Sequence, residues 1–232
     1  MVSIVVYLPH RGFDFHRPSA HIGAMHVHVI FAHPAPDSLN GACLQRVLDT
    51  LVMHGHTVDL LDLYRDGFDP VMSEDEQHGY KAGQPAPIAR SYGARLHDAE
   101  ALVFVFPTWW YGAPAILKGY LDRVWSRGIV FEEPAKPGRP PKPLLTQLQR
   151  FVVITTAGGP KLFMRWLMGD PVKRVMMRGV KRMCAGPTGH DFLCLYGAET
   201  ASPAAYARFL DRVEATVARL PRPRPVKAAH RA

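Results

Sequence analysis

Three short stretches of the 232-residue chain carry residue types suited to a flat, phosphorylated ligand. Residues 33–40 place hydroxyl and amide side chains before an amphipathic run, where a helix start offers unpaired backbone amides to a phosphate. Residues 107–114 hold three consecutive aromatics between two prolines, and such rings stack on planar groups. Residues 155–160 join two threonines to Gly-Gly-Pro, and glycines let the backbone approach a ligand closely. Together these stretches predict a site for an aromatic cofactor that carries a phosphate.

Each stretch also has an ordinary structural interpretation. Asp37 or Ser38 could simply cap a helix, the aromatics could form a satellite hydrophobic cluster, and Gly-Gly-Pro is a common turn. Only the coincidence of all three favours a ligand site. The sequence contains neither G-x-G-x-x-G nor G-x-x-x-x-G-K-[ST], which argues against the usual dinucleotide and nucleoside triphosphate motifs. A flavin phosphate is the remaining candidate.

The elements that must position these stretches alternate between strand and helix patterns. Helices are predicted over residues 44–51, from Pro114 onward and over 203–220, while 66–91 is expected to form a long surface excursion with at most short helices. Residues 133–143 contain five prolines and are predicted to be a loop. Apolar runs predict five strands, at residues 27–32, 58–63, 101–106, 151–156 and 191–196. This alternation favours an α/β fold with a parallel sheet covered on both faces, whose ligands bind beyond the carboxyl ends of the strands.

The three stretches, in this order, resemble those of the flavodoxin-like NAD(P)H:quinone oxidoreductases, the group that includes DT-diaphorase and bacterial quinone reductases. Leu63-Tyr64 followed by Phe68-Asp69-Pro70-Val71 is similar to that family's segment after the second strand, and residues 114–124 are close to a family hallmark. The likeness runs from about Met25 to Gly159. It implies a flavodoxin-like three-layer fold with a five-stranded parallel sheet in the order 2-1-3-4-5.

The resemblance also implies a non-covalent FAD or FMN that takes hydride from NADPH or NADH and passes two electrons to a quinone or similar acceptor. A homodimer is expected. The implied cofactor-binding residues lie around the phosphates (His33, Ser38, Leu39, Asn40) and against the ring (Pro107, Thr108, Trp109, Trp110, Tyr111, Thr155, Thr156, Gly158, Gly159).

One departure from the family concerns proton handling. Family members carry a tyrosine and a histidine downstream of the glycine pair, whereas the alignment places Phe163 or Met164 and Gly169 or Asp170 at these positions. The sequence therefore assigns no catalytic residue. It leaves two alternatives: a general flavin reductase, or a flavin-bound regulatory subunit that reports redox state to a membrane transporter with little turnover. A one-electron flavodoxin carrier ranks last, because such carriers are acidic and this chain has a pI of about 9.6.

The ends of the chain differ from its centre. Residues 1–24 are predicted to be an irregular extension, residues 25–220 the flavin-binding domain and 221–232 a basic Pro/Arg tail. Natural translation starting at Met25 is a hypothesis. Five Lys or Arg residues in the last fourteen positions account for most of the net charge of +8, and a solvated tail is expected rather than a nucleic-acid partner. No secretory signal or membrane span is expected, so the predicted location is the cytoplasm.

Residues 160–189 hold seven Lys or Arg residues and five methionines, with Asp170 as the one acid. Helical spacing places the apolar residues Val172, Val175, Met176, Gly179, Val180 and Met183 on one face. An ordinary amphipathic helix is the favoured interpretation; the alternatives are an arginine for the 2′-phosphate of NADPH and weak contact with an anionic membrane. The paired histidines are expected to be structural, with no metal, and the three cysteines to be buried thiols.

Overall fold

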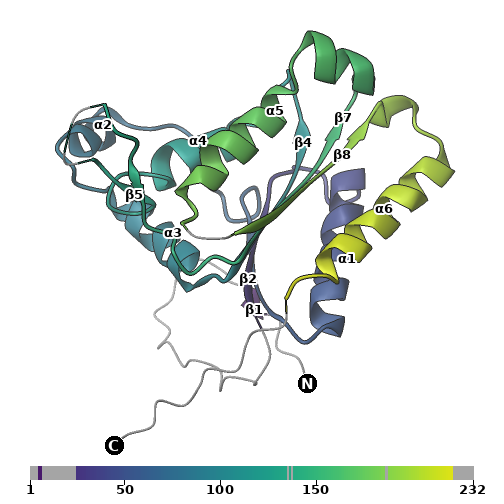
Figure 1. Ribbon diagram of the computed structural model, residues 1–232, viewed down its shortest axis with the longest axis horizontal. Helices are drawn as coiled ribbons and strands as arrows, with labels where there is room; N and C mark the ends of the chain where they lie inside the picture. Colours follow the sequence, from purple (N-terminus) through teal and green to yellow (C-terminus); the bar gives the residue numbers. More distant parts are fainter. Residues whose placement is uncertain (1–4, 7–24, 135, 137, 186–187, 222–232) are drawn as a thin grey trace, which may run out of the picture.

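In the computed structural model, the described part of the chain comprises residues 5–6, 25–134, 136, 138–185 and 188–221. A parallel sheet lies between two layers of helices (Figure 1). The strands of this sheet, from one edge to the other, are β1 (Val5–Val6), β3 (Thr57–Asp62), β2 (His26–Phe31), β4 (Ala101–Thr108), β7 (Arg150–Ala157) and β8 (Gly189–Tyr196). The five predicted strands and their order are confirmed. The short strand β1, which the sequence did not predict, pairs with β3.

Two helices cover one face of the sheet, α1 (Leu39–Met53) and α6 (Pro203–Val217). Their apolar residues pack against alternate positions of the central strands, while the intervening positions face the opposite layer. The other face carries α3 (Pro87–Asp98), α4 (Ala115–Val124) and α5 (Pro171–Arg174), and α2 (Glu74–Lys81) lies beyond them (Figure 1). Each of the central strands β4 and β7 is therefore buried on both sides, as its nearly continuous apolar sequence predicts. No helix in the described ranges is long and apolar enough to span a membrane.

Two sequence predictions need correction outside the sheet. The excursion predicted to hold at most short helices contains the start of the twelve-residue helix α3. Its apolar residues, which include Ala89 and Leu96, pack into the core. This single buried stripe is enough to order the helix despite the Gly and Pro residues nearby. The predicted proline-rich loop also contributes a short strand, β6 (Lys142–Pro143), which pairs antiparallel with β5 (Phe131–Glu132).

The basic segment is helical but irregular. It continues from α5 through the π-helical η2 (Val175–Gly179) to the 3₁₀ turn η3 (Val180–Met183). A π-helical turn contains more residues than an α-helical turn, so residues four positions apart in the sequence lie on the same face. The buried positions are accordingly Val172, Met176, Val180 and Cys184. Val175 and Gly179, both predicted to lie on the apolar face, are exposed, Val175 with 54% of its surface, so that part of the prediction is wrong.

The close approach of α4 to the loop after β3 depends on a glycine. A Cβ atom at Gly119 would lie 2.3 Å from the Pro70 carbonyl oxygen. The contact joins two segments that the sequence singled out, residues 68–71 and 114–124, and it anchors the helix that follows the aromatic stretch.

A buried polar network joins β2, β3 and α3. The His28 imidazole is fully buried, with Nδ1 2.8 Å from Asp59 Oδ2, and Arg95 donates Nε–H to the same oxygen at 2.9 Å. Burial lowers the pKa of His28, so the ring is neutral and Nδ1–H donates to the carboxylate. Burial alone would raise the pKa of Asp59, but the hydrogen bonds from His28 and Arg95 outweigh it and lower this pKa well below its usual range. The network holds three neighbouring elements in register.

The three cysteines, all predicted to be buried thiols, differ in their burial. Cys43 and Cys184 are buried as expected, whereas Cys194 is only half-buried, and all three are free thiols. No group of three or more His, Cys, Asp or Glu residues suited to a metal occurs within the described ranges. The tail beyond Pro221 and nearly all of residues 1–24 lie outside those ranges.

Candidate functional site

The carboxyl ends of β2, β4 and β7 lie side by side in the sheet, and the three stretches predicted to bind a ligand lie at these ends; the second includes the last two residues of β4 and the third the last three residues of β7. We call residues 33–40 the first loop, 107–114 the second loop and 155–160 the third loop. In the register of β4 with β7, Pro107 is opposite Thr156 and Thr108 is opposite Ala157. The fold therefore brings the three loops together at the sheet edge where α/β proteins bind their ligands.

Side-chain contacts join each loop to the other two. The ring centroids of His33 and Trp109 are 5.8 Å apart, which links the first and second loops. Asn40 donates Nδ2–H to Thr156 Oγ1 at 3.0 Å, which links the first and third loops. The hydroxyl oxygens of Thr108 and Thr155 are 3.0 Å apart, which links the second and third. One connected surface results from residues that are between 47 and 116 positions apart in the chain.

The first loop is tightly folded around the start of α1. Ser38 is the N-cap, since its Oγ accepts from the Gly41 amide at 3.1 Å and donates to the Ala35 carbonyl at 2.8 Å. His33 Nδ1 accepts from the Ala35 amide at 3.0 Å. A Cβ atom at Gly41 would lie 1.9 Å from the Pro36 carbonyl oxygen, so only glycine lets the loop lie this close to the helix. The half-buried Leu39 opens the helix, which presents its amino end at the site.

The second loop ends in a tight hairpin turn. Trp109 and Gly112 exchange two backbone hydrogen bonds, of 3.0 Å and 2.9 Å, around Trp110 and Tyr111. Both central residues have positive φ values, 48° and 61°, which is the geometry of a type I′ turn. Bulky residues rarely adopt this conformation, and such strain is concentrated at functional sites. The turn holds Trp110 outward with 94% of its surface exposed and leaves Trp109 42% exposed.

The third loop combines buried hydroxyls with an open backbone. The Thr155 and Thr156 side chains are buried and engaged in the inter-loop contacts, whereas Gly158 is exposed. No backbone–backbone hydrogen bond between described residues uses the amides of Trp110, Tyr111 or Gly158. Among the predicted site residues, Asn40, Thr155 and Thr156 thus hold the loops together. The backbone amides of Trp110, Tyr111 and Gly158 are the groups available to a ligand.

The positions where the family's tyrosine and histidine are missing lie next to the third loop. Phe163 is partly exposed and Met164 is buried, and both belong to the π-helical turn η1 (Phe163–Leu167). Asp170 is buried with a left-handed backbone, φ 49°, and accepts a hydrogen bond from the Tyr196 hydroxyl at 2.5 Å. Burial, together with this bond, raises the pKa of Tyr196, so the phenol stays protonated.

Sequence reasoning missed Tyr196. The signal was present, because it is the last residue of the fifth strand and pairs with Ala157, which places it at the same carboxyl edge as the three loops.

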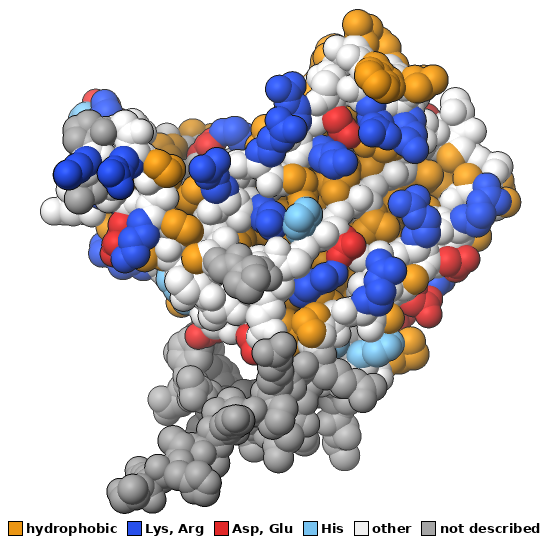
Figure 2. All heavy atoms as spheres, viewed as in Figure 1, with side chains coloured by type: hydrophobic (Ala, Val, Ile, Leu, Met, Phe, Trp, Pro, Cys, Tyr) orange, Lys and Arg blue, Asp and Glu red, His pale blue; other side chains and the backbone are white. Residues whose placement is uncertain are grey.

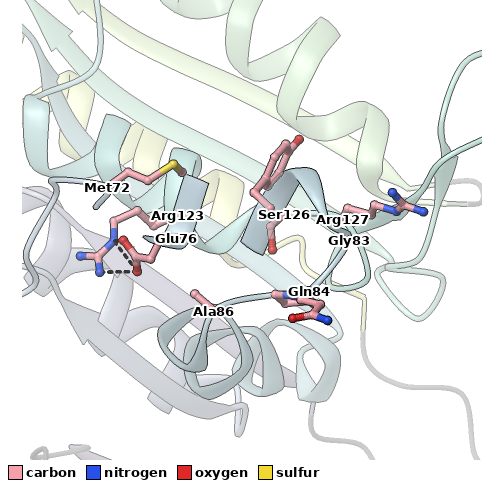
Figure 3. Close-up of a pocket in the computed structure, with 10 residues that line it drawn as sticks. Met72, Glu76, Gly83, Gln84, Ala86, Arg123, Ser126 and Arg127 are labelled. Carbon is pink, nitrogen blue, oxygen red and sulfur yellow. Dashed lines mark hydrogen bonds and ion pairs between the residues drawn. The ribbon is translucent and has the colours of Figure 1, made fainter. Parts of the chain in front are cut away.

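A separate hollow lies away from the loops, between α2 and the carboxyl end of α4 (Figure 3). The ion pair of Arg123 with Glu76, 2.6 Å between Nη2 and Oε1, closes one side of it. The volume inside is about 10 Å³, enough for about one water molecule. The buried hydroxyl of Ser126 has no protein partner among the described residues, and a water there would satisfy it. This hollow is too small for a cofactor.

Comparison with known proteins agrees with the geometry. A protein-family model described as a flavodoxin-like fold matches residues 25–217, most of the chain. The chain belongs to the flavodoxin-like fold family. Among solved structures in this fold, Smu.1420 from Streptococcus mutans UA159 is 28% identical, with a TM-score of 0.74, over 84% of this chain and 100% of that one. The NAD(P)H:quinone oxidoreductase from Methanothermobacter marburgensis is 26% identical, with a TM-score of 0.71, over 84% of this chain and 96% of that one.

Curated relatives match a shorter region. The uncharacterized NAD(P)H oxidoreductase YcaK of Escherichia coli (strain K12) is 36% identical over 107 residues, which are 45% of this chain and 55% of the relative. The chain spans about half the length of the curated relatives it matches. These names confirm the resemblance that the three loops predicted.

Proposed function

We propose that this flavodoxin-like chain is a flavin-dependent NAD(P)H oxidoreductase that reduces a quinone or a similar acceptor. The observation that carries the proposal is the meeting of three loops of unusual composition, joined pairwise through Asn40, Thr108 and the His33–Trp109 pair, at the carboxyl edge of the sheet. The names of the relatives and solved structures, NAD(P)H oxidoreductase and NAD(P)H:quinone oxidoreductase, support it.

The residues present fit FAD or FMN. The amino end of α1, behind the first loop, supplies a positive dipole end for a phosphate, while the second and third loops supply exposed aromatic surface and unused amides for a ring and its polar edge. A bound flavin would supply the chemistry of hydride transfer and two-electron reduction. The chain would position the reactants, and the amides of Trp110, Tyr111 and Gly158 would stabilise negative charge on the cofactor.

Protonation in this proposal has no dedicated side chain. Tyr196 and Asp170 are hydrogen-bonded to each other, so neither is assigned as an acid. We propose that water supplies the proton. The three free thiols agree with a reducing compartment, and we propose a cytoplasmic location.

An absorption spectrum of the purified chain, followed by anaerobic NADPH or NADH and then a quinone, tests the proposal. We expect flavin absorbance that bleaches on addition of the donor and returns with the quinone, and extraction then distinguishes FAD from FMN. Flavin that stays oxidised would contradict the reductase and favour the regulatory alternative. Failure to bind either flavin after reconstitution would reject the cofactor itself.

The proposed assembly is a homodimer. Large apolar side chains are exposed beside the site, and Figure 2 shows a hydrophobic cap at the top of the view, where Figure 1 draws the green turn that precedes α5. This cap consists of Leu162 (73% exposed), Trp166 (82%) and Leu167 (73%), with Phe163 and Tyr111 in ring contact at 6.3 Å between centroids. Exposed apolar patches of this kind mark association surfaces in soluble proteins.

We expect Trp166→Glu to convert the dimer to a monomer, because it places a charge at the centre of an apolar interface. Sedimentation velocity at several protein concentrations measures this, with Val71→Glu as the control, since Val71 is also apolar and 69% exposed but belongs to the loop before α2. A wild-type chain that sediments as a monomer at every concentration, or a Trp166→Glu chain that remains dimeric, would contradict the assignment.

A further inference from the structure

A larger cavity lies on the edge strand β8, beside the third loop. Its volume is about 370 Å³, within the range of roughly 300–1,000 Å³ typical of small-molecule sites. Residues from four parts of the chain line it: the segment after the third loop, α5, β8 and α6. Gly197 donates its amide to the Gly159 carbonyl at 2.9 Å, and the neighbouring Tyr196 is in the wall, so the cavity and the glycine pair are adjacent.

Four cations line this cavity: Lys161, Arg165, Lys173 and Arg212. None of them has an ion pair with a carboxylate of the described chain, in contrast to Arg46, Arg123 and Arg150. In Figure 2, Lys and Arg side chains gather on both sides of the diagonal strip where β8 runs in Figure 1. Like charges gathered around one hollow repel each other, and a bound anion would relieve that repulsion.

The floor of the cavity is neutral and largely apolar. Phe192 is half-buried and its ring centroid is 5.7 Å from the Lys173 ammonium. Burial raises the pKa of Cys194 to about 12, so this residue is a neutral thiol. The Asp170 carboxylate, which lies close enough to Cys194 to contribute to its raised pKa, already accepts a hydrogen bond from Tyr196. A ligand here therefore meets positive charge at the rim and an apolar, partly aromatic surface beneath.

We propose that this cavity binds the phosphate monoester of an organic ligand. A phosphate monoester carries nearly two negative charges at neutral pH, which matches two arginine forks and two lysine ammonium groups better than a single carboxylate does. The apolar floor accommodates the organic part. Since the cavity adjoins the third loop, a nucleotide donor anchored here by its ribose phosphate would have its other end at the three loops proposed to bind the flavin. That identification of the ligand rests on the proposed function.

Isothermal titration calorimetry of the full chain with phenyl phosphate and with adenosine 2′,5′-bisphosphate tests the site without any electron transfer. The test variant is Lys173→Gln with Arg212→Gln, and the control is Arg178→Gln with Arg208→Gln. The control pair removes the same charge from exposed positions near α5 and on α6 that do not line the cavity. We expect the test variant to bind at least about tenfold more weakly and the control to change little.

Adenosine 2′,5′-bisphosphate binding far more tightly than phenyl phosphate would support the site and identify the nucleotide donor as its ligand. Equal affinities would support the site with a different phosphate ester as its ligand. No binding of either probe at millimolar concentration would overturn the proposal. Equal losses in test and control variants, or binding that the test variant retains, would also overturn it, because the phosphate would then sit elsewhere, for instance at the first loop. Since no flavin or turnover enters the measurement, failure of the proposed reductase activity would leave this result unaffected.

Discussion

Replacing Asp59 by asparagine is expected to lower the free energy of unfolding by about 3–5 kcal/mol. The substitution keeps the size of the side chain but removes the negative charge that faces the Arg95 guanidinium, whose Nη2 lies 2.5 Å from Asp59 Oδ1 in a nearly buried setting. It also removes the carboxylate to which the fully buried His28 donates. A charge buried without its counter-charge costs far more than the pair contributes, which is why the effect is large.

Urea denaturation followed by tryptophan fluorescence measures this change. Asp122→Asn is the control, because Asp122 also pairs with a cation, Lys118, but both side chains are exposed and the pair should contribute less than about 1 kcal/mol. An Asp59→Asn protein that loses no more stability than the control would show that the network is not buried in solution.

The same network sets the response to acid. The pKa of folded His28 is below its ordinary value, so the unfolded chain takes up this proton first and stability falls as the pH drops below about 6.5. The folded pKa of Asp59 is also lowered, so its contribution is complete above an unfolded value of about 3.9 and is lost as the pH falls through the folded one. Both effects favour unfolding in acid, and the Asp59→Asn protein should lack the second.

Replacing Gly41 by alanine is expected to weaken flavin binding by about tenfold to a hundredfold, equivalent to about 1.4–2.7 kcal/mol. The added methyl group would lie 1.9 Å from the Pro36 carbonyl oxygen, a backbone atom that cannot move without opening the first loop. Opening the loop displaces the amides at the amino end of α1, where the proposal places the phosphate, and it disturbs the adjacent link from Asn40 to Thr156.

Fluorescence titration of the flavin-free chain with FAD and FMN measures the loss. Gly179→Ala is the matched control, since a Cβ atom there would meet nothing within 4 Å and its φ is negative. Unchanged affinity in a folded Gly41→Ala protein would move the phosphate away from the first loop.

Much of the sheet could be predicted because its signals are local. The nearly unbroken apolar runs of β4 and β7 indicate strands buried on both faces, and the loops after them are recognisable from their aromatic and glycine content. The convergence of these loops then follows from the geometry of parallel sheets.

The features that the sequence did not predict depend on the type of helical turn and on contacts between residues that are far apart in the chain. The exposure of Val175 results from a π turn, which no spacing rule for an α-helix contains. Tyr196 and Asp170 are 26 residues apart, and Asn40 and Thr156 are 116 residues apart, so their hydrogen bonds appear only once the strands are placed in register. The positive φ values of Trp110 and Tyr111 run against the preferences of bulky residues, and local reasoning therefore missed them.

That turn also has a consequence for engineering. Its backbone geometry suits Asn-Gly far better than Trp-Tyr, so a selection for heat resistance alone would be drawn toward Asn-Gly at these two positions. The same exchange would remove the most exposed aromatic ring of the described chain from the mouth of the site. Thermal stability and ligand binding thus favour different residues at these two positions, and a screen for one property alone will select against the other.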